Sequence, residues 1–183
     1  MRRRMADSLI PEPSRRGRIL DIGCGSFPSF LHSTRFQEKF GVDRALSGST
    51  IAESKEAGIH LAAYDLNCDA PLPYPSGFFQ VVTLLAVYEH VDPARLAPLM
   101  IEVYRVLAAD GTLIITTPAA WTSGILKLLA LLRLVSAEEI EEHQGAYSSG
   151  DLLETLGQAG FQSNRIRSGT FEFGMNLWAT ARK

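Results

Sequence analysis

Three aspartates that could bind a polar ligand stand at the ends of three apolar, β-rich runs: Asp21 in LDIGCG, Asp43 in GVD and Asp65 in YDLN. Because the carboxyl ends of neighbouring parallel strands meet at one edge of a sheet, we expect these acids to lie close together. A carboxylate at Asp21 repels a pyrophosphate and suits an ammonium group. Asp43 can accept both hydrogen bonds of a ribose diol, and Asp65 can accept one from an adenine amino group beside the Leu66 backbone. The three acids therefore favour a ligand in which an amino acid, a ribose and a base are joined in that order.

The glycine loop after Asp21 narrows the choice of nucleotide. Gly23 and Gly25 let the main chain come close to a ligand, since neither carries a Cβ. A phosphate-binding P-loop ends in Gly-Lys-Ser/Thr, but this loop continues as SFP, which excludes ordinary ATP or GTP chemistry. A dinucleotide fingerprint would place its last glycine at Pro28, so an NAD-dependent oxidoreductase is disfavoured and stays open as an alternative.

The elements that must position these residues alternate between β-rich and helical runs, which predicts an α/β fold with a parallel sheet. Strands are predicted over Arg18–Ile22, Phe40–Asp43, Leu61–Tyr64, Phe79–Leu85 and Thr112–Thr116, and helices over Ser29–Glu38, Ser47–Glu56, Pro93–Leu107 and Ser149–Ala159. Two more strands follow Gly160 with a short connection, so they must be antiparallel. We therefore expect a Rossmann-like, doubly wound sheet of seven strands, mostly parallel, with the last strand reversed.

Composition excludes several classes of protein. The 183 residues suffice for one domain, and the net charge of -2 gives no electrostatic footprint for nucleic acid. Two cysteines are too few for a disulfide framework and suit a reducing, cytoplasmic setting. No apolar run reaches the roughly 20 residues needed for a transmembrane segment. Small-molecule chemistry is the expectation that remains.

Two segments of the chain differ in composition from the rest. Residues 1–16 are basic and have no apolar segment of the signal-peptide type, so we expect a flexible leader before a single domain over 17–183. Residues 125–135 are apolar on nearly all sides of a predicted helix. Such a helix must be covered by its own domain, by a second subunit or by an apolar ligand, and a homodimer through it is one candidate.

The motifs together resemble those of a known family. In order along about 17–161, the chain reads LDIGCG (20–25), GVD (41–43), DLNCDAPLPYPSGFFQVV (65–82), TLLAVYEHV (83–91) and GTLIITTP (111–118). This series resembles class I S-adenosylmethionine-dependent methyltransferases, in the small-molecule, methyltransferase type 11-like group. The resemblance implies the strand order 3-2-1-4-5-7-6, with S-adenosylmethionine bound across the carboxyl ends of the first four strands and S-adenosylhomocysteine as product.

The resemblance also implies a site. The predicted cofactor-binding residues are Asp21, Gly23, Cys24, Gly25, Asp43, Arg44, Asp65, Leu66 and Leu85. His90 and His143 are the candidate catalytic residues, because histidine can accept a proton near neutral pH. A variable substrate lid is expected over about 119–147. Related metal-dependent enzymes read E-x-x-E-H where this chain has Ala86 in place of the first glutamate, so we predict no metal.

Besides the disfavoured NAD-dependent oxidoreductase, two hypotheses of function remain open. The first is methyl transfer to a small molecule, with a hydroxyl favoured and nitrogen or carbon acceptors open. No Asn/Asp-Pro-Pro-Tyr/Phe signature of nucleic-acid methylation occurs at LAVYEH. The second is a non-catalytic binding or interaction subunit. It rests on Ala86, on Phe27 where the family commonly has a third glycine, and on Gln80 where it has an acid.

Overall fold

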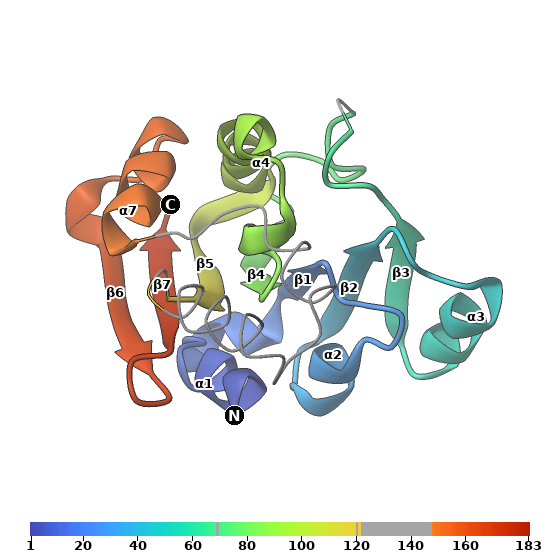
Figure 1. The fold of residues 1–183 in the computed structure, drawn as a ribbon. Helices are drawn as coiled ribbons and strands as arrows, with labels where there is room; N and C mark the ends of the chain where they lie inside the picture. Colours follow the sequence, from blue (N-terminus) through green and yellow to red (C-terminus); the bar gives the residue numbers. More distant parts are fainter. Residues whose placement is uncertain (69, 120, 122–147) are drawn as a thin grey trace, which may run out of the picture.

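The sheet has the predicted order. A computed structural model describes residues 1–68, 70–119, 121 and 148–183, and in them one seven-stranded sheet runs β3-β2-β1-β4-β5-β7-β6 (Figure 1). The strands are β1 (Arg18–Ile22), β2 (Glu38–Asp43), β3 (Ile59–Ala63), β4 (Phe79–Leu85), β5 (Leu107–Pro118), β6 (Ile166–Phe171) and β7 (Asn176–Arg182). β7 pairs antiparallel with β5 and β6, and the other pairs are parallel, which confirms the predicted reversal of the last strand.

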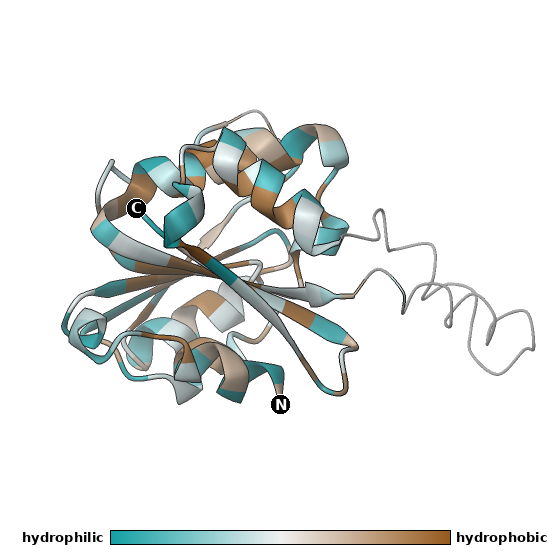
Figure 2. Cartoon of the chain, turned by 90° about the vertical axis from the view of Figure 1, so that its left-hand side faces the viewer, coloured by the Kyte–Doolittle hydropathy of each residue, from teal (hydrophilic) through white to brown (hydrophobic). Residues whose placement is uncertain are grey.

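Helices cover both faces of the sheet. They are α1 (Arg2–Ser8), α2 (Ser29–Ser33), α3 (Gly48–Glu56), α4 (Pro93–Val106) and α7 (Ser149–Gln158), with short 3-10 turns η1 (Glu12–Arg16), η2 (Tyr88–His90) and η3 (Ser163–Arg165). α4 and α7 lie on one face, and α1, α2 and α3 lie on the other (Figures 1 and 2). Alternate residues of a strand therefore enter two cores: Leu20 and Ile22 pack in the α4 layer, whereas Ile19 packs with α1 and α2.

The strand register brings the polar strand ends together. Asp21 is paired with Gly41 of β2 on one side and with Thr83 of β4 on the other. Asp43 is paired with Ala63, the last residue of β3. The carboxyl ends of the first four strands therefore form one continuous edge, as the switch-point rule requires for a ligand site.

The first 16 residues correct the expectation of a flexible leader. Instead of a solvated tail, α1 and η1 pack against the sheet, with Ala6 fully buried and Ile10 7% exposed. Both side chains belong to the same core as Ile19 and Val81. This packing could not be predicted, because two apolar residues within a basic segment do not make a helical periodicity.

Arg15 ties this segment to the rest of the fold. Its side chain is 13% exposed and donates hydrogen bonds to Asp7 Oδ1 (3.1 Å), Glu12 Oε2 (2.9 Å) and Thr34 Oγ1 (3.3 Å). Partial burial acts to raise the pKa of Asp7, but the hydrogen bonds from Arg15 and Thr34 outweigh it and hold that pKa below its ordinary value. Arg15 thus links α1, η1 and the end of α2.

Element bounds differ from the predicted ones where tertiary pairing competes with local propensity. α2 ends at Ser33 and not at Glu38, because Glu38 already pairs with Arg18 and opens β2. In the part of the chain that the structure describes, no helix is both long and apolar enough to cross a membrane. The apolar helix predicted over 125–135 lies outside the described residues.

Replacing Arg15 with alanine should lower the free energy of unfolding by about 1–2 kcal/mol, because it removes several hydrogen bonds from a mostly buried guanidinium. Chemical denaturation measures the change. Arg16→Ala removes an equal charge from the same turn and is the matched control, with little expected effect. Equal stability of the two variants would contradict the anchoring role of Arg15.

Candidate functional site

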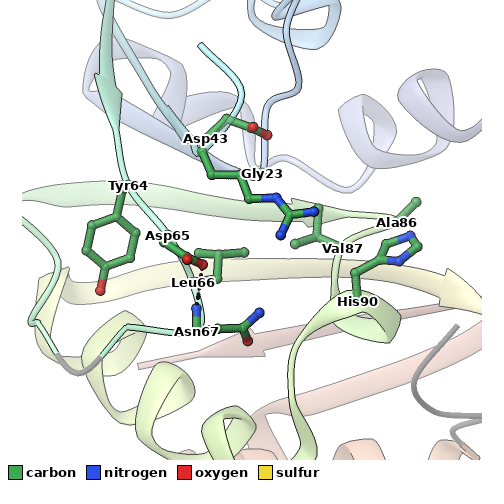
Figure 3. Close-up of a pocket in the computed structure, with 10 residues that line it drawn as sticks. Gly23, Asp43, Tyr64, Asp65, Leu66, Asn67, Ala86, Val87 and His90 are labelled. Carbon is green, nitrogen blue, oxygen red and sulfur yellow. Dashed lines mark hydrogen bonds between the residues drawn. The ribbon is translucent and has the colours of Figure 1, made fainter. Parts of the chain in front are cut away.

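A first cavity of about 380 Å³ opens at the carboxyl ends of β1 to β4 (Figure 3). Its lining residues are Gly23, Asp43, Arg44, Tyr64, Asp65, Leu66, Asn67, Ala86, Val87 and His90. Asp43 is the last residue of the second strand, Asp65 follows the third strand and His90 follows the fourth, so three strand ends contribute polar groups. The cavity is large enough for a nucleoside and has acids where a nucleoside has donors.

Asp43 is held in one orientation by the main chain. Its Oδ2 accepts a hydrogen bond from the Gly25 amide and its Oδ1 accepts one from the Ala45 amide, both at 2.8 Å. Each carboxylate oxygen can accept a second hydrogen bond. Asp43 therefore has one acceptor position on each oxygen for the two hydroxyls of a ribose.

The loop after β3 is fixed in a similar way. Asp65 Oδ1 accepts a hydrogen bond from the Asn67 amide at 3.0 Å, and Asn67 Oδ1 accepts one from the Asp92 amide at 3.0 Å. Asp92 is the N-cap of α4, so the loop is tied to the start of that helix. The Asp65 side chain stays exposed at the cavity, where it can accept a bond from a base amino group.

Backbone conformation explains why glycine is required at the centre of the site. Gly23 has φ +71°, and a Cβ there would come within 2.4 Å of the Val87 side chain. Ala86 also has a positive φ of 60°, and its amide donates to the Thr116 carbonyl at 2.9 Å. A non-glycine residue held in this region is a strained one, and such residues cluster at ligand sites.

A second cavity of about 360 Å³ adjoins the first. Its lining residues are Met1, Arg2, Arg3, Asp21, Gly23, Cys24, Ser29, Phe30 and Leu85. Gly23 lines both cavities, so a ligand that crosses Gly23 could occupy the two together.

Asp21 is the buried acid of the second cavity. Its side chain is 4% exposed, and Thr83 Oγ1 donates to its Oδ1 at 2.6 Å. Burial raises the pKa of Asp21 to about 7, the Thr83 hydrogen bond opposes the shift, and the negative charge of Asp43 adds to it. The carboxyl group is thus poised to lose its proton when a cation binds beside it.

Cys24 contributes a neutral thiol to the same cavity. Burial, with the negative charges of Asp21 and Asp43, raises its pKa to about 12. A thiol that stays protonated near neutral pH is a poor nucleophile. Cys24 is therefore suited to contact a ligand and not to attack one.

The structure brings most of the predicted site residues together. Asp43, Arg44, Asp65, Leu66 and His90 line the first cavity, Asp21, Cys24 and Leu85 line the second, and Gly23 lines both. Gly25 reaches the site through its bond to Asp43. His143 and Tyr147 of the expected lid lie outside the described residues.

Other lining residues were missed by sequence reasoning. In the first cavity these are Tyr64, Asn67, Ala86 and Val87, all of which flank predicted residues and could have been found from the strand ends. In the second cavity they are Met1, Arg2, Arg3, Ser29 and Phe30. The two arginines belong to no motif, so only the packing of α1 reveals them.

His90 sits in η2, directly after the buried Glu89. Glu89 is 2% exposed, and its Oε2 accepts a hydrogen bond from Thr117 Oγ1 at 3.0 Å. This bond ties η2 to β5 and fixes the stretch of chain that places His90 beside Ala86 and Val87 (Figure 3).

Two departures from the family motifs lie away from the cavities. Phe27 is 64% exposed and stacks on His32 at a centroid distance of 5.1 Å, outside the described lining of both cavities. Gln80 Oε1 accepts a hydrogen bond from the Arg18 amide at 2.7 Å, at the opposite end of β1. Neither residue narrows the site.

Among the described residues, no cluster of three or more histidine, cysteine or acidic side chains could hold a metal, and metal independence stays a prediction.

Comparison with known proteins identifies the chain's relatives. A family model described as a methyltransferase domain matches residues 1–164, whereas no curated protein sequence matches the chain. A solved S-adenosylmethionine-dependent methyltransferase from Mesorhizobium loti is 20% identical with a TM-score of 0.72, covering 98% of this chain and 96% of that chain.

Two further solved structures resemble the chain with the same TM-score of 0.72. A methyltransferase from Thermotoga maritima, described as a possible histamine N-methyltransferase, is 18% identical over 100% of this chain and 87% of that chain. A putative methyltransferase from Haloferax volcanii, solved in complex with the Trm112 methyltransferase activator, is 14% identical over 98% of this chain and 87% of that chain. At these identities the similarity establishes the fold.

The buried acid predicts a pH-dependent stability. Because the pKa of Asp21 is raised to about 7 in the folded protein, its protonated form stabilises the fold at low pH, and this stabilisation is lost as the pH rises from about 4 to 7. Asp21→Asn has nearly the same shape and no charge. It should be more stable than the parent protein at pH 8 by roughly 1–4 kcal/mol and no more stable at pH 4.

Thermal or chemical unfolding across that pH range measures the difference between variant and parent. Asp65→Asn is the matched control, because Asp65 is exposed and asparagine keeps an oxygen for the Asn67 amide. An Asp21→Asn variant that is less stable than the parent at pH 8 would contradict the raised pKa.

Proposed function

The chain belongs to the family of S-adenosylmethionine-dependent methyltransferase domains, and from this premise we propose that it methylates a hydroxyl group of a small molecule. The observation that carries the proposal is the junction of the two cavities at Gly23. An acid suited to a ribose, Asp43, lies on one side of this junction, and an acid suited to an ammonium group, Asp21, lies on the other.

The residues present fit the cofactor from end to end. Asp65 and the Leu66 backbone are positioned for the adenine ring, and Asp43 has two acceptor positions for the ribose diol. Asp21 can hold the ammonium group of the methionine part, with the glycine loop between the two acids. When bound there, S-adenosylmethionine supplies a methyl group activated by a sulfonium centre.

The protein then has two tasks. It must hold the acceptor in line with the methyl group, and it must take a proton from a hydroxyl acceptor. His90 is the candidate proton acceptor, since it lines the first cavity after β4, beside Ala86 and Val87. The strained Ala86 turn and the Glu89–Thr117 bond support His90 in this place.

Charge and composition favour one class of methyl acceptor and one cellular location. A net charge of -2 provides no attraction for a nucleic acid backbone, which favours a small molecule. Cys24 and Cys68 are both free, which favours a reducing, cytoplasmic setting. Oxygen is favoured as the acceptor atom because a histidine base is useful where a hydroxyl must lose its proton.

Two of the three residues that favoured a non-catalytic subunit, Phe27 and Gln80, no longer argue for it. Phe27 is outside the described lining of both cavities, and Gln80 bonds the Arg18 amide at the far end of β1. Only Ala86, where metal-dependent relatives carry an acid, still separates the site from theirs, and a metal-independent transfer does not need that acid.

Asp43→Ala should weaken binding of S-adenosylhomocysteine by several-fold to a few hundred-fold, since each charged hydrogen bond contributes about 1.5–3 kcal/mol. Isothermal titration calorimetry measures the change, with NAD titrated in parallel as a ligand that should not bind. Glu53→Ala, which removes an exposed acid from α3, is the matched control. Unchanged affinity in Asp43→Ala would exclude the ribose assignment.

The acceptor class is tested by release of S-adenosylhomocysteine from S-adenosylmethionine with matched phenols, alcohols, amines and thiols. We expect turnover with a hydroxyl acceptor. With that acceptor, His90→Gln should lower kcat by about 100-fold or more and flatten its pH profile, while affinity for S-adenosylhomocysteine stays near that of the parent. Turnover of amines alone, or a His90 variant of full activity, would contradict the hydroxyl proposal.

A further inference from the structure

The second cavity contains positive charge that the proposed function leaves unexplained. Arg2 and Arg3 of α1 line it together with Asp21, Gly23, Ser29 and Leu85. α1 lies on the same face of the sheet as α2, and it contacts β4 and β5 (Figure 1). Two guanidinium groups and one buried acid therefore border the same space.

Arg2 is fixed in place and still has hydrogen-bonding capacity. Its Nη2 donates to Asn176 Oδ1 at 3.0 Å, and Asn176, the first residue of β7, is itself 8% exposed. Arg2 Nε is buried and has no hydrogen-bond partner among the described residues. Of the five N–H donors of its guanidinium group, the described residues bond only one, to Asn176, and Arg2 borders the cavity with donors left for a ligand.

Arg3, which lines the same cavity, is held more loosely. Its Nη1 makes one long bond of 3.5 Å to the Ser29 carbonyl. Within the described part of the chain, no carboxylate forms a salt bridge with Arg2 or Arg3. Guanidinium groups of this kind match the two oxygens of a carboxylate well.

We propose that Arg2 and Arg3 bind the carboxylate of the methionine part of the cofactor, opposite Asp21. This assignment rests on the proposed function. The amino and carboxylate groups of an α-amino acid are attached to one carbon, so their partners must border one cavity. Asp21 and the two arginines meet that condition, because all three line the space that begins at Gly23.

The contacts that hold α1 against the sheet would then also serve ligand binding. Ala6 and Ile10 hold α1 and the segment after it in the core, and Arg15 ties the same segment to Thr34. These contacts fix the start of α1 over the carboxyl edge of the sheet. The carboxylate contact would then let the protein distinguish an amino acid conjugate of adenosine from a simple nucleoside.

The test compares two ligands that differ by one group. Decarboxylated S-adenosylhomocysteine keeps the adenosine and the ammonium group and lacks only the carboxylate. Calorimetry with both ligands is carried out on the parent protein, on Arg2→Gln, on Arg3→Gln and on the double variant. Arg4→Gln removes the same charge from the same helix and is the matched control, because Arg4 is exposed and lies outside the described cavity lining.

The double variant should lose about ten-fold or more in affinity for S-adenosylhomocysteine, whereas its affinity for the decarboxylated ligand should equal that of the parent. Arg4→Gln should bind both ligands as the parent does. Arg3→Gln keeps the Arg2–Asn176 bond, so its loss of affinity, confined to the carboxylate ligand, would separate binding from folding.

Three results would overturn the proposal. Equal losses for both ligands would mean that the arginines only support the fold. Unchanged affinity for S-adenosylhomocysteine, with lost turnover of carboxylate-bearing acceptors, would move the contact from the cofactor to the acceptor. Unchanged affinity and turnover would leave the arginines without a role in binding. Failure of the parent protein to bind either ligand would instead overturn the proposed function itself.

Discussion

The hydrogen bond between the Thr83 hydroxyl and the buried Asp21 carboxyl group joins the two central strands at the point where the cavities meet. Asp21 is flanked by Gly41 on β2 and by Thr83 on β4, so its position fixes how the carboxyl ends of three strands align. The glycine loop leaves β1 from this position. Its Gly25 amide then donates a hydrogen bond to Asp43 at the end of β2, which connects the buried acid to the partly buried one through the main chain.

Burial of Asp21 disfavours its charged form in the free protein and strengthens its interaction with a bound cation. A carboxyl group removed from water without a cation resists ionisation, which is the physical reason for the raised pKa of Asp21. The same group becomes a strong partner once a positively charged ligand enters, because both charges are then shielded from solvent. Strain at Ala86 and the buried donor of Arg2 fit the same pattern. These three features lie at the edge of the sheet where the ligand is proposed to bind.

The sequence predicts features that depend on local patterns and misses those that depend on packing. Asp21, Asp43 and Asp65 could be assigned to strand ends because each follows an apolar run, and the reversed last strand followed from the short connection after Gly160. The structure of the first 16 residues could not be predicted, since the burial of Ala6 and Ile10 and the Arg15 network involve partners distant in sequence. Arg2 and Arg3 were missed for the same reason. The role of Gln80 also depends on a partner distant in sequence, the Arg18 amide.

One ligand is proposed to cross Gly23 and to occupy both cavities. A crystal structure of the protein with S-adenosylhomocysteine would show whether it does. We expect the ribose hydroxyls on the two oxygens of Asp43, the adenine beside Asp65 and Leu66, and the ammonium group within hydrogen-bonding distance of Asp21. A ligand bound elsewhere, or one whose ribose lies away from Asp43, would contradict it.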